Sequence, residues 1–178
     1  MGGDAPIIDA CWSGFVDLRS APEKALQLPE VIEFPALGSA LVTFDASGSS
    51  FFTVKCDVWP VETIDPIEFD APTESAIHAL ACYIDLLRCD PESWTDPQVA
   101  IDWCKKVCSA LQASSLRCSR VDLVTRSAIR PTGQSAIGVT AYVSACGRTQ
   151  EAAEATLALA LKRLTECIQS TESGMRSR

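Results

Sequence analysis

The chain has 178 residues, of which 47% are hydrophobic and 21% charged, and its formal net charge is -8. This composition is too apolar for an acidic disordered chain and too polar for a bundle of membrane-spanning helices. We expect one domain over residues 20–169, an N-terminal arm over 1–19 and a polar tail over 170–178.

The N-terminal sequence and the cysteines indicate the compartment. No basic start followed by an apolar run opens the chain, so a secretory signal is not predicted. Nine cysteines occur without any C-x-x-C spacing, which is not the pattern of a zinc ribbon or a thioredoxin motif. We expect reduced thiols in the core of a cytoplasmic protein.

The first half of the chain predicts a short helix followed by extended segments. Ser20-Ala21-Pro22-Glu23 is typical of a helix start, and that helix is expected to end near residue 28. Strands are predicted over 31–34, 39–45 and 51–59, with a hairpin loop between the last two. Prolines interrupt the next stretch, which leaves room only for an edge strand over 67–69.

The second half favours helices around one clear hairpin. Apolar residues at helical spacing predict a helix over 73–89. Asp96-Pro97 predicts the start of another helix, which ends near residue 112. Alternating residues predict a hairpin of strands over 120–130 and 135–146, and a last helix covers 149–169.

Both halves, 20–89 and 96–169, thus run helix, hairpin, helix. The apolar stripes of these helices need a sheet to pack against. We predict an α+β fold in which two hairpin–helix units, separate or fused, form an antiparallel sheet with helices mainly on one face.

Charge is distributed unevenly along the chain. Residues 1–102 carry 18 acidic and 4 basic side chains, whereas residues 103–178 carry 5 acidic and 11 basic ones. The acidic candidates follow one another without a basic residue between them: Asp57, Glu62, Asp65, Glu68, Asp70 and Glu74. The basic candidates lie on or near the predicted hairpin: Arg117, Arg120, Arg126 and Arg130. We expect an acidic face and a basic face, which either meet within the chain or bind neighbouring subunits.

The only histidine, His78, is the best catalytic or metal candidate. On the predicted helix it shares a face with Cys82, Asp85 and Cys89. Residues stacked along one helix do not converge on one point, as a zinc site or an activated cysteine requires. The sequence also has no glycine-rich phosphate loop and no G-x-S-x-G motif. We therefore predict no catalytic residue, no metal ligand and no cofactor.

Protein–protein contact is the function that these observations favour. We predict a non-enzymatic structural or assembly subunit that binds copies of itself or neighbouring subunits, and frequency among assembly proteins favours a bacteriophage virion component. The alternative is an acidic inhibitor, such as an immunity or anti-defence protein, that covers a basic site on a partner. A small enzyme built on the His78 face or on the acidic strand is a third hypothesis. A pI of about 4.6 argues against nucleic acid as a partner. No membrane segment is predicted, because the sequence has no apolar run long enough to cross a bilayer.

Overall fold

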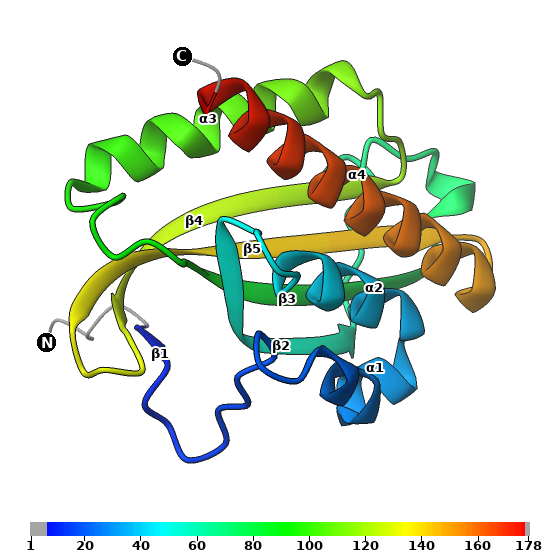
Figure 1. The fold of residues 1–178 in the computed structure, drawn as a ribbon. Helices are drawn as coiled ribbons and strands as arrows, with labels where there is room; N and C mark the ends of the chain where they lie inside the picture. Colours follow the sequence, from blue (N-terminus) through cyan, green and yellow to red (C-terminus); the bar gives the residue numbers. More distant parts are fainter. Residues whose placement is uncertain (1–6, 177–178) are drawn as a thin grey trace, which may run out of the picture.

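A five-stranded sheet in the order β1-β4-β5-β3-β2 is the centre of the computed structural model, which describes residues 7–176 (Figure 1). Residues 1–6 of the predicted arm and 177–178 of the predicted tail lie outside the described residues. The strands are β1 (Ile8–Asp9), β2 (Phe51–Pro60), β3 (His78–Arg88), β4 (Ser119–Ile129) and β5 (Ser135–Gly147). The helices are η1 (Pro22–Gln27), α1 (Pro29–Glu33), α2 (Pro35–Phe44), η2 (Thr73–Ser75), α3 (Pro97–Ala113) and α4 (Gln150–Arg176).

The sheet is mixed and curls on itself. β1 runs parallel to β4, whereas the other neighbouring strands are antiparallel. Ile8 of β1 is buried with Phe52 and Val54 of β2, at the opposite edge of the sheet, so the strands form a nearly closed barrel. Gly138 of β5 makes room for this contact, because a Cβ there would lie 2.8 Å from Ile8 Cδ1.

The predicted fold class, an antiparallel sheet of two hairpin–helix units, is therefore wrong. The parallel strand β1 comes from the N-terminal arm and has only two residues. Two residues are too few to show the alternation that indicates a strand.

Helices α2, α3 and α4 lie over one face of the sheet, which we call the covered face (Figure 1). The main core lies between them, and it includes Ile84 of β3, Val143 of β5, Trp103 of α3 and Leu157 of α4. Burying such large apolar side chains contributes roughly 1.5–3 kcal/mol each, which makes this layer the main source of stability.

Five predicted elements are confirmed. The strand over 51–59 is β2, the helix over 96–112 is α3, the hairpin is formed by β4 and β5, and the last helix, over 149–169, is most of α4. The predicted cap of α3 is also present, since the Asp96 carboxylate accepts the Gln98 N–H at 2.9 Å.

The predicted helix over 73–89 is wrong, because most of that segment is strand β3. Its side chains are buried on both faces: Ile84 packs in the main core and Leu87 packs with Ile8 on the opposite side. A strand buried on both faces has a nearly continuous apolar sequence, which matches a helical stripe as well as it matches a strand.

The predicted early strands are also wrong. The segments over 31–34 and 39–45 lie mostly in α1 and α2, and each of these helices begins with a proline in its first turn. The predicted helix ending near residue 28 is a 3-10 helix, η1. Instead of an edge strand, 67–69 forms turns.

Helix α4 continues past residue 169, where a polar tail was expected. Glu172 is buried there and pairs with Arg88 of β3 at 2.7 Å, and the Trp103 indole N–H donates to its other oxygen at 2.8 Å. Glu172 thus ties this part of α4 to the core. Within residues 7–176, no helix combines the length and apolar character that crossing a bilayer requires.

Candidate protein-binding surface

The connection between β2 and β3, residues 61–77, forms compact turns that we call the acidic turn. The Asp65 carbonyl accepts the Glu68 N–H at 3.1 Å, and the Asp65 carboxylate accepts the Ile67 N–H at 2.9 Å. The Ile67 carbonyl accepts the Asp70 N–H at 3.2 Å. Asp70 has φ +47°, a left-handed conformation that aspartate tolerates better than most residues. These bonds fix the backbone of the turn.

Phe69 and Ile67 lie on opposite sides of this turn. Phe69 is buried against Ala79 and Cys146, so it anchors the turn to the sheet. Ile67 is 88% exposed. The acidic turn therefore presents a large apolar side chain to solvent on a support that is held from inside.

The six predicted acidic residues are all exposed: Asp57, Glu62, Asp65, Glu68, Asp70 and Glu74. Asp57 accepts the Val58 N–H at 2.8 Å, and Glu68 pairs with Arg120 at 3.2 Å. Carboxylates in this position remain hydrated, so the acidic run forms a charged surface and not an internal network.

The four predicted basic residues have different environments. Arg117 is exposed. Arg120 forms an ion pair with Asp122 at 2.7 Å, in addition to its ion pair with Glu68. Arg126 donates to the hydroxyls of Thr140 and Tyr142 at 2.9 Å each. Arg130 is buried.

The Arg130 guanidinium donates to the carbonyls of Arg88 and Asp90, at 2.9 and 3.2 Å. Two of the four arginines thus make contacts inside the fold. The structure brings Glu68 and Arg120 together and does not gather the four arginines on one exposed face.

The sheet face opposite the helices, the open face, carries an aromatic row that the sequence analysis missed. Ring centroids lie 6.1 Å apart for Trp59 and Tyr83, and 5.9 Å apart for Tyr83 and Tyr142. Beside this row, the Thr140 hydroxyl donates to Asp85 at 2.6 Å, and burial raises the pKa of Asp85. This row could not be predicted from a helix over 73–89, since only the alternation of a strand places Tyr83 and Asp85 on one face.

The expected cluster around His78 does not form. His78 is exposed at the start of β3, Cys82 is buried on the covered face, and Asp85 lies on the open face. Cys89 follows the strand and packs with the cluster around Ile8. The prediction that these residues share one face is wrong, because side chains alternate along a strand. Within the described residues, no group of three or more His, Cys, Asp or Glu side chains is placed to hold a metal ion.

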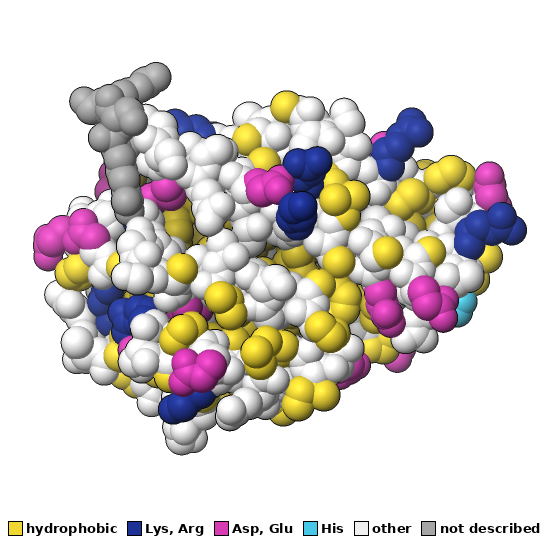
Figure 2. All heavy atoms as spheres, turned by 45° about the vertical axis from the view of Figure 1, so that its right-hand side comes forward, with side chains coloured by type: hydrophobic (Ala, Val, Ile, Leu, Met, Phe, Trp, Pro, Cys, Tyr) yellow, Lys and Arg dark blue, Asp and Glu magenta, His cyan; other side chains and the backbone are white. Residues whose placement is uncertain are grey.

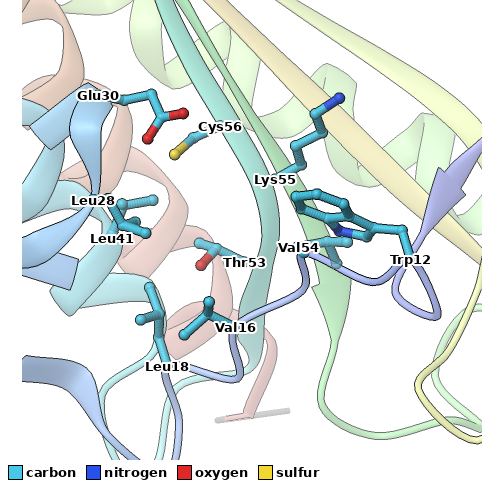
Figure 3. Close-up of a pocket in the computed structure, with 11 residues that line it drawn as sticks. Trp12, Val16, Leu18, Leu28, Glu30, Leu41, Thr53, Val54, Lys55 and Cys56 are labelled. Carbon is cyan, nitrogen blue, oxygen red and sulfur yellow. The ribbon is translucent and has the colours of Figure 1, made fainter. Parts of the chain in front are cut away.

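A pocket lies between the segment 12–18, helices α1 and α2, and the outer edge of β2 (Figure 3). Glu30 and Cys56 lie at one end of it, and Trp12 and Lys55 at the other (Figure 3). Burial, followed by the charge of Glu30, raises the pKa of Cys56 to about 12. The thiol is therefore protonated at neutral pH, which makes Cys56 a poor nucleophile.

Exposed hydrophobic side chains also occur on the helices. Ile32 of α1, Val42 of α2 and Leu159 of α4 are exposed. Figure 2 shows hydrophobic side chains on this side of the molecule, interspersed with polar atoms and with charged groups of both signs. Scattered exposure of this kind is normal for a protein surface.

Comparisons with protein-family models, curated proteins and solved structures find no match for this chain. Its function therefore has to be inferred from its own residues. The acidic turn combines a fixed backbone, a run of carboxylates and an exposed isoleucine, and is the strongest candidate surface.

Proposed function

We propose that this chain is a non-enzymatic structural or assembly subunit that acts through protein–protein contacts, with the acidic turn as its contact surface. The exposed Ile67, on a turn anchored by Phe69, carries this proposal. A preorganised contact loses little conformational entropy on binding, and burying an isoleucine contributes roughly 1.5–3 kcal/mol. The narrower expectation of a bacteriophage virion component stays a prediction.

The surface that receives the acidic turn needs an apolar hollow with a basic rim. A groove of about 390 Å³ between α3 and β4 has a mixed lining, with the apolar residues Leu111, Leu116 and Val121 beside the polar residues Gln112, Ser115 and Ser119. Arg117, the exposed neighbour of Leu116, adds positive charge. A second copy of the chain therefore provides a surface of the required kind.

The relative position of the acidic turn and the groove supports a symmetric arrangement of two copies. Asp70 of the acidic turn also lines the groove, so turn and groove are neighbours on one surface. Adjacent complementary surfaces fit a two-fold dimer, in which each copy inserts Ile67 into the groove of the other.

Sedimentation velocity at about 50 and 500 mM salt tests the proposal, because the screening length differs severalfold between these conditions. We expect a dimer at low salt and dissociation at high salt. Ile67→Ser and Arg117→Glu should each weaken association at least about tenfold, which corresponds to 1.4 kcal/mol. Ile32→Ser is the matched control, since Ile32 is 70% exposed on α1, outside the turn and groove.

A monomer at both salt concentrations would contradict self-association, and so would equal effects of Ile67→Ser and Ile32→Ser. The monomer would favour the acidic inhibitor as the second candidate. That candidate has its own support: Arg126 and Arg130 are engaged inside the fold, which leaves the exposed acidic run in excess. An inhibitor should bind one basic protein with an association rate that falls as salt rises.

A further inference from the structure

Two cysteines face each other beneath the acidic turn. The pairing of Ser119 with Ala145 places Cys118 directly opposite Cys146 in the next step of the antiparallel ladder. The Cys146 N–H donates to the Cys118 carbonyl at 2.8 Å, which confirms that the ladder extends to this pair. Residues opposite each other at the end of such a ladder have Cα atoms about 4.5–5.5 Å apart, and both cysteine side chains pack in the cluster around Phe69. Disulfides span such distances.

The surroundings of the two thiols differ. Both pack in the cluster that contains Phe69 and Ala79, but Cys146 is buried and Cys118 is only half-buried. Burial raises the pKa of Cys146 to about 11. An oxidant from solvent therefore reaches the sulfur of Cys118 first.

Cys118 also has an unusual backbone. Its φ is +55°, in the left-handed region that L residues other than Asn, Asp and His seldom adopt. Such conformations persist only where neighbouring structure holds them, and they occur preferentially at functional sites.

We propose that Cys118 and Cys146 are a reversible redox pair, which hydrogen peroxide converts into a cross-strand disulfide. The Cys118 thiolate attacks one peroxide oxygen, the O–O bond breaks, and the departing hydroxide takes up a proton to become water. Cys118 is then a sulfenic acid. The Cys146 sulfur attacks the Cys118 sulfur, the S–S bond forms as the S–O bond of the sulfenic acid breaks, and the released hydroxide and the Cys146 proton form a second water. Two electrons pass from the two sulfurs to one peroxide. This inference does not depend on the proposed function.

Peptide mapping of the whole chain tests the pair directly. Trypsin releases the two cysteines in separate peptides, residues 118–120 and 127–148, each with a single cysteine. After treatment with hydrogen peroxide and alkylation of free thiols, we expect these peptides to be linked, with a mass two hydrogens below their sum. Dithiothreitol should separate them. Closing this loop should raise the Tm of the oxidised protein by about 5–10 °C.

Two single substitutions provide the controls. Cys118→Ser should abolish both the linked peptide and the rise in Tm. Cys108→Ser, which removes a half-buried cysteine on α3, should preserve both. The proposal would be overturned if both cysteines were alkylated after oxidation, if either were linked elsewhere, or if Cys118 were oxidised beyond the sulfenic acid as the main product.

Discussion

One arginine–glutamate pair lies on the covered face, and a second pair, in a contrasting environment, joins the acidic turn to β4. Arg88 of β3 and Glu172 of α4 pair between the sheet and the helix with side chains 15% and 11% exposed, and Trp103 adds a hydrogen bond. Glu68 and Arg120 lie at the surface with side chains 57% and 43% exposed. A buried charge depends on its partner, whereas an exposed one is hydrated with or without it. The first pair therefore belongs to the fold, and the second is available to a partner.

Removing Glu172 should give the largest effect on stability. Glu172→Ala leaves the Arg88 charge buried without its carboxylate, which should lower the free energy of unfolding by about 3–5 kcal/mol. Glu166→Ala is a control on the same helix, because the pair of Glu166 with Arg163 is exposed and should contribute less than about 1 kcal/mol. Urea unfolding of the two variants measures both. Equal losses would contradict the contrast between buried and exposed pairs.

Within the acidic turn, substitutions of the buried Phe69 and of the exposed Ile67 should have very different effects on the free energy of unfolding. Phe69→Ala opens a cavity under the turn and should lower the free energy of unfolding by about 3 kcal/mol. Ile67→Ser should change it by less than about 0.5 kcal/mol, because Ile67 makes its contacts with solvent. Thermal unfolding followed by circular dichroism compares the variants. A large loss for Ile67→Ser would show that the side chain serves the fold.

Asp45 tests a buried carboxylate whose hydrogen bonds come from Thr53. Burial raises its pKa to about 6, although the hydroxyl and the N–H of Thr53 donate to it and act in the opposite direction. The unfolded pKa is about 3.9, so the folded state binds the proton more tightly. The resulting stabilisation is complete below about pH 4 and is lost as the pH rises through 6, a decrease of about 2–3 kcal/mol.

The variant Asp45→Asn lacks this proton and isolates the effect. The difference in free energy of unfolding between wild type and variant should change in favour of the variant from pH 4 to pH 7. Urea titrations at several pH values provide the two curves. Parallel curves would mean that Asp45 does not titrate in this range.

The smallest effect is expected for the exposed pair. Glu68→Gln should cost less than about 0.5 kcal/mol at 50 mM salt and nothing measurable at 500 mM. A loss that persists at high salt would indicate that Glu68 holds the acidic turn in place.

The sequence predicted those elements whose signal is local. Strand β2 and the hairpin of β4 and β5 show alternation, and α3 begins at Asp96 with a cap visible in the sequence. Strand β3 was not predicted, because apolar side chains are buried on both of its faces. The end of α4 was not predicted, because Glu172 is polar. It is buried only because it has partners in β3 and α3.

The candidate surface was predictable only in part. The run of acidic residues and its exposure follow from composition and from the prolines around it. The exposed position of Ile67 could not be predicted from composition, since an edge strand was expected there. The turn depends on the contact of Phe69 with residues that are distant in the sequence. The inward positions of Arg126 and Arg130 depend on hydroxyls and carbonyls from other strands, which no local pattern reveals.

The methyl NMR signals of Ile67 and Ile32 provide the most direct test of the acidic turn as a contact surface. Both side chains are exposed, at 88% and 70%, so each reports on its own surface in the same sample. On lowering the salt from about 500 to 50 mM at constant protein concentration, which lengthens the range of electrostatic attraction, the Ile67 signal should shift or broaden while the Ile32 signal stays constant. Association that perturbs Ile32 and leaves Ile67 unchanged would contradict a contact through the acidic turn.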